Sequence, residues 1–143
     1  MKAFKMVSNA APTAAQLLTI TPIYAALLAL FYIILSFAVI KQRHANKVSL
    51  GDNGVPSLRK AIAVHSNFSQ YVPFALLLIT FVEINYGAPY LVHGLGASLL
   101  FGRLAHAYGL AQANQIMILR QIGMVLTFFV MIIAAILLLI HIF

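Results

Sequence analysis

Four long stretches of this sequence contain no Lys, Arg, Asp or Glu. They run from Met6 to Ile40, Ala61 to Val82, Ile84 to Gly102 and Gln121 to Phe143. A helix that crosses the hydrocarbon core of a bilayer needs about 20 apolar residues, so each stretch is near or above that length. Only 8% of the 143 residues are charged, whereas a soluble domain needs about 25%. The sequence therefore predicts an all-α integral membrane protein, a bundle of four helices.

The charged residues between these stretches give approximate helix boundaries. We predict helices over residues 17–41, 57–84, 88–110 and 115–142. They form a single domain, residues 17–143, after an N-terminal tail, residues 1–16, that lacks the apolar core of a signal peptide. Barrel strands would alternate polar and apolar residues, which these stretches do not do. At 1.5 Å per residue, the second helix of roughly 28 residues is about 42 Å long and should tilt or project from the membrane.

The basic residues are distributed unevenly around the helix ends. Seven of the nine lie on one predicted side: Lys41, Arg43, Lys47, Arg59, Lys60, Arg103 and Arg120. By the positive-inside rule that side is cytoplasmic, which predicts a multi-pass inner (cytoplasmic) membrane protein with both termini on the non-cytoplasmic side. Because these charges are dispersed at helix ends, they do not form a surface for nucleic acid. The absence of cysteine excludes disulfides and thiolate metal sites.

The second predicted helix carries polar residues where lipid disfavours them. On a 3.6-residue period Asn67, Gln70 and Tyr71 share one face, and Arg59 lies near the same stripe two turns earlier. Pro73 leaves a backbone carbonyl without its usual donor, which suits a cavity. The alternative is that these side chains only join helices, at about 0.6 kcal/mol for each hydrogen bond.

The third predicted helix places two ionisable residues one turn apart, Arg103 and His106, which face the same way. Two such groups together indicate a site rather than a helix contact. Small residues at a spacing of four lead up to them and predict close helix packing: Gly94, Ser98 and Gly102. Arg120 then opens the fourth helix, where the alternative role is snorkelling to lipid headgroups.

The four arginines of the chain therefore gather near one membrane face, close to the polar residues of the second and third helices. Guanidinium groups bind carboxylates through two parallel hydrogen bonds, and a nearby cation stabilises a thiolate. The composition of this region predicts an anion pocket, which a small polyanionic ligand that carries a thiol would fit. The arginines are Arg43, Arg59, Arg103 and Arg120.

Three segments resemble the signatures of the MAPEG family, the membrane-associated proteins in eicosanoid and glutathione metabolism. They are residues 48–78, with VSLGDNG, LRKA and HSNFSQYVPFALLL in order, residues 102–109, GRLAHAYG, and residues 119–127, LRQIGMVLT. The resemblance covers nearly all of residues 17–142 and is nearest to the small bacterial branch. It implies a homotrimer of four-helix subunits that holds glutathione, as co-substrate, between neighbouring subunits near the cytoplasmic face.

The resemblance also implies roles for individual residues. The positions that match the family's ligands for glutathione are Arg43, Asn67, Tyr71 and Arg103, and His106 matches a position that contributes to the site. Arg120 falls near the arginine proposed to activate the thiol. Gln70 stands where the family usually has Glu, so it offers a neutral carbonyl oxygen to the ligand's ammonium group. Leu110 replaces a tyrosine of the eicosanoid synthases, so eicosanoid specificity is not expected.

The expected function is that of a glutathione transferase or peroxidase that detoxifies lipophilic electrophiles entering from the lipid bilayer. The ligand set, Arg43, Arg59, Asn67, Gln70, Tyr71, Arg103 and His106, would bind glutathione, and Arg120 would stabilise the thiolate without metal. One alternative is a non-catalytic module that binds an anionic ligand or a lipid headgroup. Another is a small drug exporter, for which Glu83 is the candidate carboxylate. The five histidines are scattered over the helices and predict no metal site.

Overall fold

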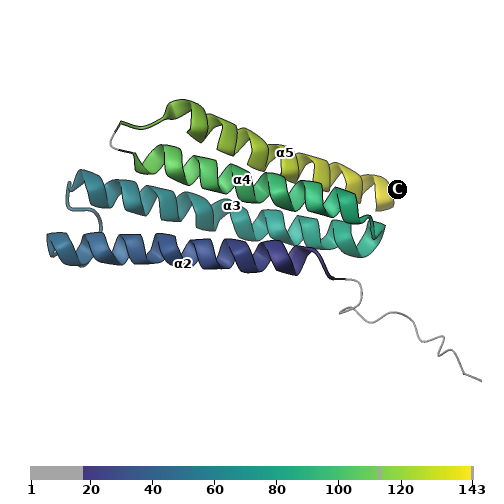
Figure 1. Cartoon of the computed structure of the whole chain (residues 1–143), viewed down its shortest axis with the longest axis horizontal. Helices are drawn as coiled ribbons and strands as arrows, with labels where there is room; N and C mark the ends of the chain where they lie inside the picture. The colour runs from purple at the N-terminus through teal and green to yellow at the C-terminus, as the bar shows by residue number, and fades with distance from the viewer. Residues whose placement is uncertain (1–17, 113, 143) are drawn as a thin grey trace, which may run out of the picture.

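The computed structural model describes residues 18–112 and 114–142, and these form four α-helices. They are α2 (Thr21–Asn46), α3 (Pro56–Tyr86), α4 (Pro89–Ala111) and α5 (Met117–Ile142). Each runs antiparallel to the next along the chain, and the α2–α3 and α4–α5 connections lie at the same end of the bundle (Figure 1). The predicted all-α four-helix bundle is confirmed, while the predicted tail lies outside the described residues.

Proline and left-handed residues set the helix ends. Pro22, Pro56 and Pro89 lie in the first turns of their helices, where a missing N–H group removes no intrahelical bond. At the other ends, Lys47 (φ 54°) and Gly87 (φ 56°) adopt the left-handed conformation that closes α2 and α3. The predicted ends at residues 41 and 84 were too early, because a charged residue marks the membrane boundary but does not stop a helix.

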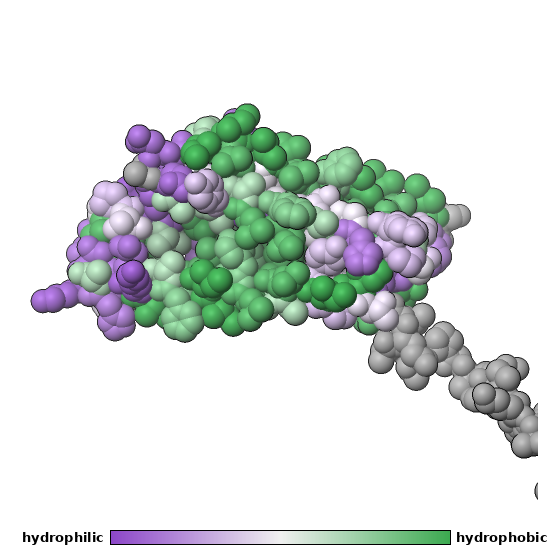
Figure 2. Space-filling model, viewed as in Figure 1, coloured by the Kyte–Doolittle hydropathy of each residue, from purple (hydrophilic) through white to green (hydrophobic). Residues whose placement is uncertain are grey.

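Three of the described helices, α2, α3 and α5, are long and apolar enough to cross a membrane. The remaining helix, α4, does not meet the same criterion over its length, and it carries Arg103 and His106, whose side chains are both buried. Lipid tolerates such a helix when its polar groups face protein. Figure 2 shows a broad hydrophobic band across the bundle and polar residues gathered at the end with the α2–α3 connection.

The core surrounds α3, which contacts α2, α4 and α5. Its most deeply buried apolar side chains come from all four helices: Leu28, Leu58, Ile79, Val92, Leu99 and Val130. Large apolar side chains also cover the outside, among them Phe37, Phe101 and Ile132. An apolar exterior of this extent is the surface that a bundle presents to lipid.

The α4 and α5 backbones approach most closely where Gly102 faces Gly123. A Cβ atom added to Gly123 would lie 2.4 Å from the Gly102 carbonyl oxygen and 2.6 Å from the Cβ of His106. The predicted small-residue contact is thus confirmed at Gly102, but it is wrong at Gly94, which is exposed and has nothing within 4 Å of an added Cβ. This crossing brings the Gly123 carbonyl to the side chain of Arg103.

At the opposite end of the bundle, Glu83 of α3 caps the start of α2. Its carboxylate accepts hydrogen bonds from the backbone N–H groups of Thr19, Ile20 and Thr21, at 2.8, 2.7 and 2.8 Å. The first N–H groups of a helix have no intrahelical acceptor, and a carboxylate there is favourable. Glu83 therefore has a structural partner, which removes the main reason for the drug-exporter alternative.

Candidate functional site

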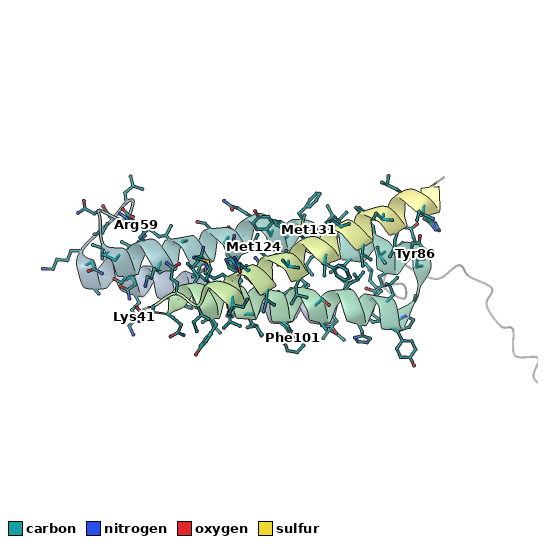
Figure 3. The ribbon with its side chains drawn as sticks, turned by 90° about the horizontal axis from the view of Figure 1, so that it is seen from above. Lys41, Arg59, Tyr86, Phe101, Met124 and Met131 are labelled. Atoms are coloured by element: carbon teal, nitrogen blue, oxygen red, sulfur yellow. The ribbon has the colours of Figure 1, made fainter. Side chains whose placement is uncertain are left out.

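The candidate site is centred on Arg103 of α4, whose side chain is 1% exposed. Its Nη1 donates to Asn67 Oδ1 of α3 at 2.8 Å, and its Nη2 donates to the Gly123 carbonyl of α5 at 3.0 Å. The thioether sulfur of Met124 lies 3.5 Å from Nη2, and the guanidinium carbon lies 6.0 Å from the centre of the Tyr71 ring. Three helices thus converge on one buried cation, next to Met124, which Figure 3 labels away from the ends of the bundle.

All of these partners of Arg103 are neutral, and its Nε is buried without a hydrogen-bond partner in the described part of the chain. The sequence contains only two acidic residues, and both are engaged elsewhere: Asp52 pairs with Arg59 and Glu83 caps α2. A buried charge without a counter-charge is costly. The guanidinium is therefore suited to an anionic ligand, which would supply the missing negative charge.

His106 lies one turn after Arg103 and is also buried. Its Nδ1 lies 3.1 Å from the backbone oxygen of Arg120. A carbonyl oxygen can only accept, so Nδ1 must be the donor, and in the neutral ring Nε2 is then an acceptor. This hydrogen bond joins α4 to the first turn of α5. It also fixes the orientation of the imidazole, one helical turn from Arg103.

Arg120 is half-buried in the first turn of α5. Its Nη1 donates to the side-chain oxygen of Gln115, while its Nε is buried and has no partner among the described residues. The Arg120 guanidinium is thus only partly hydrogen-bonded within the described part of one protomer. The backbone of Arg120 is joined to the candidate site through His106.

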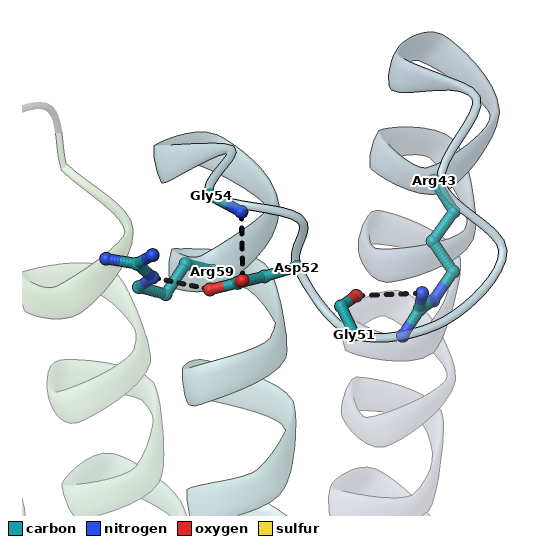
Figure 4. A network of polar contacts seen from close by, with 5 residues as sticks. All are labelled: Arg43, Gly51, Asp52, Gly54 and Arg59. Carbon is teal, nitrogen blue, oxygen red and sulfur yellow. Dashed lines mark hydrogen bonds and ion pairs between the residues drawn. The ribbon is translucent and has the colours of Figure 1, made fainter.

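Two other predicted ligands flank the α2–α3 loop, Arg43 from the last turn of α2 and Arg59 from the first turn of α3, and among the described residues of one protomer neither contacts Arg103. Arg43 Nη1 donates to the backbone oxygens of Ser49 and Gly51, at 3.2 and 3.0 Å. Arg59 Nε lies 2.5 Å from Asp52 Oδ2. Figure 4 shows the two guanidinium groups directed at different parts of this loop. The Arg59 hydrogen bond, with a second bond from the Gly54 N–H, holds the pKa of Asp52 below its usual value.

The predicted polar face of α3 is divided between two environments. Asn67 and Tyr71 are half-buried toward Arg103, whereas Gln70 is exposed on the outside of the protomer. A hollow of about 280 Å³ does lie beside Pro73, but it opens between α2 and α3, next to Ser69 and Phe68, and not beside Arg103. The cavity beside Pro73 therefore lies on the α2 side of α3 and not on the side of Arg103.

Gly123 and Met124 were not among the predicted site residues, although both contact Arg103. The sequence did contain a signal for one of them, since a glycine in an apolar membrane helix indicates a close helix contact. The carbonyl of such a glycine is accessible to a neighbouring donor because no side chain shields it. Nothing in the sequence distinguished Met124 from the other apolar residues of α5.

Comparison with known proteins identifies a family and relatives from Escherichia coli. A family model for the MAPEG family matches residues 21–140. The inner membrane protein YecN of Escherichia coli strain K12 is 40% identical over 90 residues, which cover 63% of this chain and 69% of YecN. YecN of Escherichia coli O6:H1 strain CFT073 matches with the same identity and coverage. No solved structure matches this chain significantly.

Proposed function

This chain belongs to the MAPEG family, and on that basis we propose that it is a glutathione-dependent membrane enzyme, of the transferase or peroxidase type, which acts on lipophilic electrophiles. The observation that supports a glutathione site is the buried guanidinium of Arg103, whose partners are all neutral. Glutathione carries carboxylates, and a guanidinium–carboxylate pair is among the strongest hydrogen-bonded contacts available to a protein. Its thiol supplies the nucleophile that a chain without cysteine lacks.

In the proposed site, Arg103, Asn67 and Tyr71 bind a carboxylate of glutathione and position the tripeptide. The Arg120 guanidinium stabilises the thiolate, because a cation near a thiol favours its deprotonated form. The thiolate then attacks the electrophilic carbon and forms a carbon–sulfur bond, while the leaving group departs with the electron pair of the broken bond and the thiol proton passes to water. Catalysis comes from positioning and charge stabilisation.

We also propose that the complete site lies between subunits of a homotrimer, near the cytoplasmic face. Among the described residues of one protomer, Arg43, Arg59 and Gln70 do not contact Arg103, and in this proposal they contribute to the same ligand from a neighbouring copy. Gln70 is exposed and Arg43 is half-buried, which suits such a contact. In this arrangement both termini lie on the non-cytoplasmic side of the inner membrane.

Replacement of Arg120 by alanine is expected to lower turnover by roughly tenfold or more, since each unit by which the pKa of the thiol rises reduces the thiolate about tenfold. Arg120→Lys, which keeps the positive charge, should recover part of the rate. The measurement is the rate of glutathione conjugation to chlorodinitrobenzene, and of lipid-hydroperoxide reduction, by the purified protein in detergent. Asn67→Ala should instead raise the KM for glutathione.

The matched control is Asn85→Ala, because Asn85 lies on the same helix as Asn67 but is exposed, and within the described residues its side chain donates to the Phe81 carbonyl of its own helix. This variant should keep the wild-type kcat and KM. Wild-type turnover in Arg120→Ala would show that Arg120 does not activate the thiol. Absence of glutathione-dependent turnover in the wild-type protein would refute the enzymatic proposal.

A second candidate function is binding of an anionic ligand without catalysis. It is favoured by Gln70, which has no charge to offer an ammonium group, and by the hydrogen bond between Arg120 and Gln115. Titration with glutathione beside the turnover assay distinguishes the two functions: a module that binds without catalysis would show no glutathione-dependent turnover, and one that takes a lipid headgroup at Arg103 would not bind glutathione.

A further inference from the structure

Two neighbouring hollows lie on the side of the bundle formed by α2, α3 and α4. Neither is lined by Arg103 or by its partners Asn67 and Met124. Each has a volume of about 510 Å³, and the two share Leu35, Val64 and Ala111 in their walls. None of Asn67, Tyr71, Arg103 or Arg120 lines either hollow. We refer to the two hollows together as the α2–α4 groove.

The two halves of the α2–α4 groove differ in chemistry. One half is lined by Lys41 and Lys60, with the polar side chains of Gln42 and Ser57. Lys60 Nζ donates to the Gln112 carbonyl at 2.9 Å, which holds its ammonium group at this end of the bundle. The other half is apolar, and its walls include Phe31, Leu104, Ala105, Ala107 and Tyr108.

The length of the α2–α4 groove matches that of a phospholipid in one leaflet of the bilayer. Phe31 and Lys41 both belong to α2, and ten residues of helix span about 15 Å, which is half the thickness of the hydrocarbon core. Lys41, in the cationic half, lies near the end of α2 beside the α2–α3 connection (Figure 3), and Phe31, in the apolar half, lies ten residues nearer the middle of that helix.

The charges around the α2–α4 groove favour an anion. No acidic residue lines either half. Asp52 is paired with Arg59, and Glu83 caps α2 at the far end of the bundle. Basic pockets between membrane helices bind anionic lipid headgroups.

We propose that the α2–α4 groove binds one anionic phospholipid of the surrounding bilayer. The headgroup phosphate lies between Lys41 and Lys60, and an acyl chain lies along Phe31, Leu104 and Tyr108. This lipid site is separate from the proposed glutathione site and does not depend on it.

The test is native mass spectrometry of the full-length protein released from detergent that contains phosphatidylglycerol or phosphatidylcholine. The wild-type protein should retain phosphatidylglycerol in preference to phosphatidylcholine, and the double variant Lys41→Gln/Lys60→Gln should bind phosphatidylglycerol roughly tenfold more weakly. Ala105→Phe, which fills the apolar half without changing any charge, should also weaken phosphatidylglycerol binding. Soluble glycerol phosphate should not displace the lipid, because it has no acyl chain.

The matched control is Lys47→Gln, because Lys47 is an exposed lysine at the same end of the bundle that lines neither hollow. It should retain phosphatidylglycerol as the wild type does. A loss of affinity per removed charge that is the same in Lys47→Gln as in the double variant would show attraction by net charge alone. That result, or unchanged binding in the double variant or in Ala105→Phe, would overturn the proposed site.

Discussion

Replacement of Glu83 by alanine is expected to lower the free energy of unfolding by about 3 to 5 kcal/mol, the usual cost of breaking a buried charged network. The Glu83 side chain is 4% exposed, and its two oxygens accept hydrogen bonds from three successive backbone N–H groups, those of Thr19, Ile20 and Thr21. Hydrogen bonds to a charged group contribute about 1.5 to 3 kcal/mol each, and a buried donor left without an acceptor costs a similar amount. The variant leaves these donors unsatisfied where α2 begins.

The measurement is unfolding of the purified protein in mixed micelles by a denaturing detergent, followed by circular dichroism. Glu83→Gln keeps one carbonyl acceptor and should fall between alanine and wild type. The control is Asp52→Asn at the other acidic residue of the chain, whose pair with Arg59 is exposed and should leave the unfolding midpoint nearly unchanged. If Glu83→Ala and Asp52→Asn unfold at the same midpoint, the cap on α2 is not an important source of stability.

Replacement of Gly123 by alanine is expected to destabilise the protein by about 2 to 3 kcal/mol, the typical effect of overpacking a closely fitted contact. The added methyl group would lie 2.4 Å from the Gly102 carbonyl oxygen and 2.8 Å from the His106 backbone nitrogen. Both atoms belong to the backbone of α4, so α5 must move away as a whole. This movement also withdraws the Gly123 carbonyl from Arg103, and glutathione affinity should fall with stability.

Gly94→Ala is the matched control, since Gly94 also lies in α4 and has open space around the added atom. Alanine has the higher helix propensity, so this variant should be neutral or more stable by up to about 1 kcal/mol. The readouts are the unfolding midpoint and the dissociation constant for glutathione. A Gly123→Ala protein as stable as Gly94→Ala would contradict the close approach of α4 and α5.

The four-helix architecture was predictable because lipid restricts the chain so strongly. A charge-free stretch of sufficient length has few alternatives to a spanning helix, and all four stretches correspond to helices. The exact ends were not predictable, because they depend on local backbone conformation and on tertiary contacts. Lys47 ends α2 in a left-handed conformation that lysine rarely adopts, and the cap on α2 comes from Glu83, more than 60 residues away.

The candidate site was also predictable in part, because lipid disfavours polar side chains that lack a partner. Asn67 and Arg103 are polar residues in an apolar setting and must face a partner, and the structure joins them by a hydrogen bond. The positions of Arg43 and Arg59 could not be predicted, because they depend on a loop that offers backbone carbonyls to one and a carboxylate to the other. Helical periodicity placed Gln70 beside Asn67 but could not say how each packs against the rest of the bundle.

The central claim is that the buried guanidinium of Arg103 is a binding site for a ligand carboxylate. Calorimetric titration of the purified protein with reduced glutathione and with glutathione diethyl ester tests it most directly, because the two ligands differ mainly in the charge of the carboxylates. We predict that glutathione binds and that the ester binds at least about tenfold more weakly, a difference of about 1.4 kcal/mol. Equal affinity for the two ligands, or no binding of glutathione, would contradict the claim.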